Sequence, residues 1–267
     1  MGMASGPVTT QPRYASATDS NPARQKLTSS NPLGALKQQI DRVIGEAGTV
    51  GASQTARALE AVADRAHLRD ALATIVGDQH LLSAVASKSY LHPNGFEKIP
   101  LAYTRTPEYK LVLHVWCGGR DAHEPSDIHN HRWDFSSMVL LGGLQWEQYE
   151  ISASLGHPMA EYRYQSPEGS GSYSLEHVGS SPLHCVLSAW FSERTTYTFS
   201  RDALHRADPG TSMSVSLVLQ GSPQQSRTRV FRSSTSHSLE CVSVRPIAKM
   251  RPPKLRHTLE AVIESLG

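Results

Sequence analysis

Residues 126–150 read SDIHNHRWDFSSMVLLGGLQWEQYE and carry two histidines one residue apart, His129 and His131. In a β-strand, residues i and i+2 point to the same face, about 7 Å apart along the chain. A third histidine, His205, lies in the run LHRADPGTSMSVSLVLQG at residues 204–221. Imidazole binds Fe, Zn, Cu or Ni, and three such ligands leave positions on the metal open for a substrate and O2. We therefore predict that His129, His131 and His205 bind a first-row transition metal.

The sequence around this pair predicts a β-rich core. The run LVLHVWC at 111–117 reads as a strand ended by two glycines, and the pair then opens an apolar run that ends at Gly142 and Gly143. After Pro100 the hydrophobic periodicity falls to two, and strands are expected near 101–105, 109–117, 129–141, 144–151, 160–165, 183–191, 195–199, 213–220 and 228–232. This organisation resembles that of cupins. We expect a mainly β protein, a cupin double-stranded β-helix barrel preceded by N-terminal helices.

The chain divides into four parts by its composition. Residues 1–30 contain mainly Ser, Thr, Pro, Gln and Gly, so we expect a disordered tail. Residues 31–98 are expected to be helical, because apolar residues recur there at helical spacing: Leu36, Ile40, Val43 and Ile44, then Leu59, Val62, Leu68, Leu72 and Ile75. The barrel is expected over 99–235. Residues 236–267 form a C-terminal extension with a short helix near 255–266.

Charge and cysteine content exclude several classes of protein. The chain has 267 residues, a net charge of +2 and no long basic run, so neither nucleic acid nor a membrane is expected as a partner. Its three cysteines, Cys117, Cys185 and Cys241, are odd in number and far apart, which argues against a disulfide framework. No apolar stretch approaches 18 residues, and the N-terminus lacks an apolar signal core. We expect a cytoplasmic protein.

The residues after the histidine pair decide which ligands the metal has. Many cupins place a glutamate ligand four or five residues after the second histidine, where this chain has Phe135 and Ser136. On a regular strand, Asp134 faces away from His129 and His131, so we expect it to be an outward-facing hydrogen-bond acceptor. No histidine is followed two residues later by a carboxylate. A site of three neutral histidines is left.

Four short motifs, in order, make the chain similar to the cysteine dioxygenase family of thiol dioxygenases. They are Tyr103-Thr104-Arg105, Trp116 followed by a Gly pair, Ile128-His129-Asn130-His131, and His205-Arg206 followed by Ser216-Leu217. The resemblance spans residues 103–223. It implies a cupin with helices before the barrel, a ferrous ion held by the three histidines, and Arg105 as the residue that binds the substrate carboxylate.

The chain also departs from this family. The family's Ser-x-His-x-Tyr triad would fall on Ser216, Val218 and Gln220, so only the serine remains. The cysteine that some members crosslink to that tyrosine would fall near Ser136. The gap from His131 to His205 is longer than usual, which the region 152–182 would absorb as an inserted hairpin or loop. Within it, residues 167–181 read as a Gly/Ser-rich loop.

Three neutral imidazoles leave Fe(II) with its full +2 charge, which favours an anionic ligand. A thiol, whose ordinary pKa is about 8.5, loses its proton when a cation binds it. Arg105 would then hold the substrate carboxylate in a bidentate fork. We predict a catalytic group of Arg105, Ser216 and Gln220, and a substrate-binding group of Arg105, Tyr103, Trp133, Phe135 and Val218.

These observations predict a non-heme Fe(II) oxygenase of the cysteine dioxygenase type, which oxidises the sulfur of a small thiol amino acid such as L-cysteine with O2. The altered triad predicts a product diverted from plain sulfinate, for example by N–S bond formation or further oxidation, in a biosynthetic pathway. Two alternatives stay open. One is a cupin isomerase or hydrolase that uses Zn or Ni as a Lewis acid, and the other is a non-enzymatic cupin that binds a small ligand. Arg105 favours the oxygenase, because it gives the pocket a carboxylate anchor.

Overall fold

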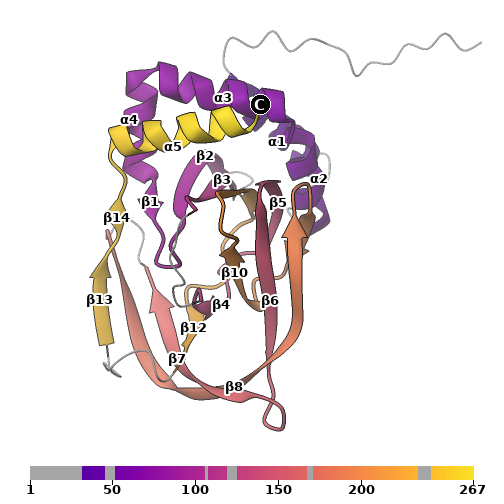
Figure 1. Ribbon diagram of the computed structural model, residues 1–267, viewed down its shortest axis with the longest axis vertical. Coiled ribbons are helices and arrows are strands. Elements are labelled where there is room, and N and C mark those ends of the chain that lie inside the picture. The colour runs from indigo at the N-terminus through magenta and orange to yellow at the C-terminus, as the bar shows by residue number, and fades with distance from the viewer. Residues whose placement is uncertain (1–31, 46–51, 106–107, 119–124, 167–170, 234–241) are drawn as a thin grey trace, which may run out of the picture.

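The computed structural model describes residues 32–45, 52–105, 108–118, 125–166, 171–233 and 242–267 (Figure 1). The predicted tail, residues 1–30, lies outside this part of the chain. The described helices are α1 (Pro32–Gly45), α2 (Ala52–Val62), α3 (Arg65–Gly77), α4 (Gln79–Lys88) and α5 (Pro252–Ser265). They gather at one end of the molecule, and the strands form the rest of it (Figure 1). None of the helices seen here is long and apolar enough to cross a membrane.

The strands that the structure describes form two seven-stranded sheets. One has the order β14-β1-β2-β3-β11-β5-β9, and the other has the order β13-β8-β6-β10-β4-β12-β7. Their bounds are β1 Tyr90–Leu91, β2 Glu97–Arg105, β3 Glu108–Trp116, β4 Ile128–His129, β5 Phe135–Leu141, β6 Gly143–Ile151, β7 His157–Gln165, β8 Ser172–Ser192, β9 Thr196–Phe199, β10 Leu204–Pro209, β11 Ser214–Gln220, β12 Thr228–Arg232, β13 Val242–Pro246 and β14 Ala248–Lys249.

The strand order is that of a double-stranded β-helix. The central strands of the two sheets run β3-β11-β5-β9 and β8-β6-β10-β4. If these eight strands are numbered along the chain, the sheets read 1-8-3-6 and 5-4-7-2, which is the jelly-roll order of two Greek keys that cupins share. Every pairing is antiparallel. The predicted cupin barrel, mainly β and preceded by helices, is confirmed.

The region between β6 and β9 is an inserted hairpin. β7 pairs with the first half of β8, from Gln165 opposite Ser174 to His157 opposite Leu183, while the second half of β8 pairs with β6. Of the two alternatives for residues 152–182, the hairpin is therefore correct. The predicted Gly/Ser-rich loop was wrong from Ser172 onward, because these residues lie on β8. That strand pairs with β13 over residues 172–176 and with β7 over residues 174–183, which include Gly179; residues 167–170 are not described. Since β7 also pairs with β12, the hairpin closes the second sheet on itself.

The strand predicted over 129–141 is two strands. β4 ends at His129 and β5 begins at Phe135. In between, the backbone N–H of Asn130 donates to the carbonyl of Arg229, and that of His131 donates to Arg201, at 3.2 and 2.9 Å. Both donors are thus used by neighbouring segments, and the chain turns after His129 instead of continuing one ladder.

The helical segment is more divided than its periodicity indicates. The apolar stripe over 59–75 spans two helices, because Asp64 interrupts it and caps α3 by accepting a hydrogen bond from the N–H of His67 at 2.9 Å. Asp78 caps α4 in the same way; this helix lies within the segment 31–98 that was expected to be helical, although beyond the two apolar stripes that indicated it. C-terminal helix α5 is confirmed near its expected position.

Successive side chains of β3 and β11 point to opposite faces of the first sheet, one of which packs in the core while the other faces the site. On β3 and β11 the apolar residues of one face are buried in the same cluster as the helices: Leu111, Leu113, Val115, Val215, Leu217 and Leu219. The other face of these strands carries His114 on β3 and, on β11, Ser216, Val218 and Gln220, which line the barrel interior. The helices therefore hold this sheet from outside and leave its inner face to the site.

Candidate metal centre

Three histidines come together inside the barrel. His129 and His205 are direct partners in the pairing of β4 with β10. Their ring centroids are 4.8 Å apart, and the ring of His131 lies 4.9 Å from that of His129 and 5.0 Å from that of His205. One ring nitrogen from each residue lies within 4.8 Å of the other two. These are the three residues that the sequence predicts as metal ligands; His131 reaches the group from the segment between β4 and β5 and not from a strand.

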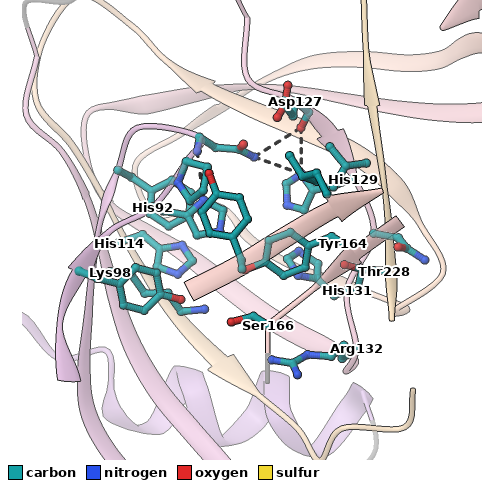
Figure 2. Close-up of a pocket in the computed structure, with 18 of the residues that line it drawn as sticks. His92, Lys98, His114, Asp127, His129, His131, Arg132, Tyr164, Ser166 and Thr228 are labelled. Carbon is teal, nitrogen blue, oxygen red and sulfur yellow. Dashed lines mark hydrogen bonds between the residues drawn. The ribbon is translucent and has the colours of Figure 1, made fainter. Parts of the chain in front are cut away.

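Backbone carbonyls orient two of the rings. The Nδ1 of His129 lies 2.9 Å from the carbonyl oxygen of Asp127 (Figure 2). The Nδ1 of His205 likewise lies 2.9 Å from the carbonyl oxygen of Ala203. A carbonyl oxygen only accepts hydrogen bonds, so each Nδ1 carries the proton and each Nε2 presents a lone pair. This second partner of a histidine ligand fixes its tautomer and its orientation.

The spacing of the nitrogens suits one metal ion. The Nε2 atoms of His131 and His205 are 3.2 Å apart. Two imidazole nitrogens bound at about 2.1 Å to one ion, with an angle of about 90–110° between them, lie about 3.0–3.4 Å apart. The donor set and its geometry therefore fit a transition-metal ion that imidazole prefers, of which iron is one.

Desolvation keeps these imidazoles neutral. Burial and, to a smaller extent, the charge of His129 lower the pKa of His205 to about 3. Burial also lowers the pKa of His129 and, together with the other two histidines, holds that of His131 well below its ordinary value. A metal ligand must be the neutral imidazole, so the three residues are ready to bind at neutral pH without losing a proton.

Aromatic side chains pack around the three rings. Trp146 stacks on His205, with centroids 4.4 Å apart and planes 12° from parallel. Phe135 meets His131 edge to face at 4.8 Å. Because rings packed on several sides lose their freedom to change rotamer, the group is preorganised.

Two adjoining cavities meet at His129 and His131. The inner one, of about 50 Å³, reaches His205 and the inner faces of β3, β5 and β11. The outer one, of about 120 Å³, lies toward β1, β2, β12 and the inserted β7–β8 hairpin (Figure 2). A small molecule in either cavity would therefore lie against the histidines.

Most of the predicted site residues line the inner cavity. Ser216, Val218 and Gln220 reach it from β11, and Trp133 and Phe135 reach it from the segment after the histidine pair. The structure thus brings these five side chains to the predicted metal ligands. Their roles in binding and catalysis stay predictions.

The other two predicted residues lie elsewhere or are not described. Tyr103 lines neither cavity: its side chain is 47% exposed, and its hydroxyl accepts a hydrogen bond from Lys88. Arg105 ends β2, where its backbone pairs with Glu108, and its side chain lies outside the described part of the chain. Asp134 is an acceptor away from the cavities, as predicted, because its Oδ1 takes the backbone N–H of Arg201 at 2.8 Å.

Sequence reasoning missed the polar residues that β2, β3 and the turn after β4 contribute. Lys98 and Arg132 line the outer cavity, and His114 lines both. His114 lies directly opposite Ser216 in the pairing of β3 with β11. The signal in the sequence was period-2 alternation, since His114 is two residues before Trp116 and Lys98 two after Phe96, which both face inward.

Several buried polar atoms around the inner cavity have no hydrogen-bond partner within the described residues. They are the Nε2 of His114 and the indole Nε1 of Trp116, Trp133 and Trp146. Indole N–H groups only donate, and buried polar groups in folded proteins are nearly always paired. The inner cavity is therefore suited to a ligand or water that offers acceptor atoms.

Comparison with known proteins gives no family. No family model and no curated protein sequence matches the chain. Among solved structures it is similar to hydroxypropylphosphonic acid epoxidase from S. wedmorenis in complex with fosfomycin, at 10% identity and a TM-score of 0.32, over 72% of this chain and 99% of that one. A cupin domain from Bordetella pertussis Tohama I matches at 13% identity and a TM-score of 0.25, over 47% of this chain and 93% of that one.

A third match is a chain from crystal structures of DMSP lyases, at 12% identity and a TM-score of 0.29. It covers 48% of this chain, which in turn spans about half (47%) of the lyase chain. Similarities this low assign no activity, so the fold rests on the strand order and the function on the site.

Proposed function

We propose that the protein is a non-heme Fe(II) enzyme that oxidises the sulfur of a small thiol amino acid, such as L-cysteine, with O2. The observation that carries this proposal is the convergence of three neutral histidines on one point at the junction of two cavities. When bound there, iron would supply a Lewis acid for the thiolate and the electrons that activate O2.

The neutral ligand set favours a thiol. No carboxylate belongs to the histidine group or lines the inner cavity in the part of the chain that is described. The ion would therefore keep its full charge, and a cation of that charge removes the proton of a thiol that binds it. A carboxylate ligand, which would lower this preference, is missing at Phe135 and Ser136.

The overall reaction balances without a further reductant. In R–SH + O2 → R–SO2H, two S–O bonds form and the O–O bond breaks. Sulfur loses four electrons, O2 gains four, and the thiol proton leaves with the sulfinic acid. Phe135, Trp146 and Val218 give the inner cavity an apolar wall, which would limit the access of bulk water to a partly oxidised sulfur.

The polar wall of the inner cavity would determine the product. Ser216 and Gln220 keep a hydroxyl and an amide there, while Val218 is apolar and replaces the histidine of the thiol dioxygenases that the chain resembles. His114, directly opposite Ser216, offers an imidazole from the neighbouring strand. We infer that Ser216 and His114 hold a proton near the sulfur, and that the altered wall diverts part of the product from plain sulfinate.

The metal ligands are tested by substitution. We expect His129→Ala and His205→Ala, purified without O2 and loaded with Fe(II), to retain little iron and to consume no O2 with L-cysteine, since even the loss of a residue that merely orients a ligand costs about 10–100-fold in metal affinity. His157→Ala, an exposed histidine on β7, is the matched control and should match the parent. Full iron content in either ligand variant would overturn the assignment.

The chemistry is tested separately. The loaded parent should consume O2 with L-cysteine, and mass spectrometry with ¹⁸O2 should find label on sulfur. The absence of O2 uptake with any thiol, together with turnover by Zn- or Ni-loaded protein under argon, would replace the oxygenase with the Lewis-acid isomerase or hydrolase.

A further inference from the structure

The outer cavity carries an uncompensated positive charge. Its charged lining residues are Lys98, Asp127, Arg132 and Arg232. Arg232 neutralises Asp127, to which its Nη2 and Nε donate at 2.6 and 2.9 Å. Neither Lys98 nor Arg132 has a carboxylate within ion-pair distance in the described part of the chain. The lining thus has three cations against one anion, a formal charge of +2.

Both cations lie beside Trp133. Lys98 Nζ is 5.4 Å from the centroid of a Trp133 ring, and the guanidinium carbon of Arg132 is 5.1 Å from the centroid of a ring of the same side chain. Burial and, to a smaller extent, the charge of Arg132 lower the pKa of Lys98 to about 8. Two like charges in a partly desolvated site are unfavourable unless an anion joins them.

Hydroxyl groups lie around the same space. Tyr90 from β1 and Tyr164 and Ser166 from the inserted hairpin line the outer cavity together with the two cations (Figure 2). Burial raises the pKa of Tyr90 to about 12 and also raises that of Tyr164. Both phenols therefore keep their protons at neutral pH and can donate hydrogen bonds.

We propose that Lys98 and Arg132 bind the carboxylate of the substrate, in a compartment that the inserted β7–β8 hairpin completes. This deepens the proposed function and rests on it for the group at the metal. The guanidinium of Arg132 offers the planar fork that matches a carboxylate, and Lys98 offers a point charge beside it. The substrate would lie with its thiol at the histidines and its acid group in the outer cavity.

Binding measurements test the pair without relying on turnover. In anaerobic calorimetry, the iron-loaded parent should bind L-cysteine at least about tenfold more tightly than cysteamine, which lacks the carboxylate. Lys98→Met and Arg132→Met should each weaken L-cysteine binding about ten- to one-hundredfold, the usual effect of losing a charge-assisted hydrogen bond, and leave cysteamine binding and iron content unchanged. Lys110→Met, an exposed lysine on β3 that lines neither cavity, should bind both as the parent does.

One further variant, Arg105→Met, and one further probe, inorganic sulfate, separate the possible failures. If Arg105→Met loses the preference for L-cysteine while Lys98→Met and Arg132→Met keep it, the anchor is Arg105 and our pair is wrong. If no thiol binds the parent, the proposed function fails, and inorganic sulfate then tests the pair alone. Sulfate bound by the loaded parent and lost in both variants would support an anion site, whereas equal binding in parent and variants would overturn it.

Discussion

We propose that His114, on a neighbouring strand, supplies the imidazole that is missing at Val218. It faces the inner cavity from β3, opposite Ser216, and its Nε2 has no partner within the described residues. Burial first, and then the charge of Lys98, holds the pKa of His114 well below its ordinary value, so the ring is neutral. A neutral imidazole both donates and accepts, and can therefore pass a proton to or from a group beside it.

We therefore expect His114→Gln to lower the rate of O2 uptake with L-cysteine by about 10²-fold or more, the typical contribution of a positioned proton donor or acceptor. Iron content should not change, because His114 is outside the histidine group. His157→Gln on the exposed face of β7 controls for the substitution itself. A rate equal to that of the parent, with the same product, would show that His114 only fills space.

At this scale, the sequence indicates ligands better than it indicates the walls of the cavity. His129 and His131 stand out because two imidazoles at positions i and i+2 of a strand point to the same face and can bind one metal ion. Lys98 and His114 do not stand out, since a lysine or a histidine on a strand is usually solvated or core. Their shared cavity depends on the pairing of Lys98 with His114 across β2 and β3, which no local pattern encodes.

Among the elements, α3 is the helix whose beginning depends most clearly on one side chain. The carboxylate of Asp64 accepts the backbone N–H of His67 at 2.9 Å and so satisfies one of the unpaired donors of the first turn. Asp64→Ala should lower the free energy of unfolding by about 1 kcal/mol, measured by urea denaturation. Asp70→Ala, an exposed aspartate later in α3, should cost much less. Equal losses in the two variants would mean that the cap is unimportant.

The boundaries of two kinds of element were not predicted: the helix ends set by caps, and the strand β8 that depends on its partners. Asp64 and Asp78 are the N-cap residues of α3 and α4, and so they divide the helical segment. Aspartate is a residue type that favours this position. By contrast, β8 runs through a stretch of serines and glycine with weak intrinsic strand preference. Its hydrogen bonds to β7 and β13 override that preference. The local sequence of β8 does not show that these two strands pair with it.

For the whole molecule, the histidine group joins strands that are far apart in the chain. His129 on β4 and His205 on β10 are 76 residues apart, yet are direct partners in the second sheet. A metal bound by both would stabilise the folded state alone, by an amount that grows with RT ln(1 + [M]/Kd), or about 2.7 kcal/mol at a metal concentration 100 times Kd. We expect the melting temperature to fall when a chelator removes the metal. In His205→Ala, the chelator should change it little; a drop as large as in the parent would place the metal elsewhere.

Low pH should weaken the ion pair between Glu147 and Arg206 that joins β6 and β10 in the second sheet. Glu147 on β6 accepts hydrogen bonds from Tyr149 at 2.6 Å and from Arg206 on β10 at 2.5 Å. Burial acts to raise the pKa of Glu147, but these hydrogen bonds together lower it below the ordinary 4.5. A carboxyl whose pKa is lower in the folded state stabilises that state above its unfolded pKa, and this contribution is lost as the pH falls below about 4.5.

The contribution of Glu147 to the free energy of unfolding should therefore be present at pH 7 and partly lost at pH 4, measured by urea denaturation with a chelator present so that metal binding does not contribute. Glu147→Gln should be less stable than the parent at pH 7 but should lose less on acidification, because the group that takes up the proton is gone. Glu150→Gln, an exposed glutamate on the same strand, should follow the parent at both pH values. If Glu147→Gln kept the full acid sensitivity of the parent, that sensitivity would come from other groups. These are the buried histidines such as His205, whose pKa is lowered to about 3 and which also cost stability as the pH falls, and Glu161, paired with Arg229 between β7 and β12.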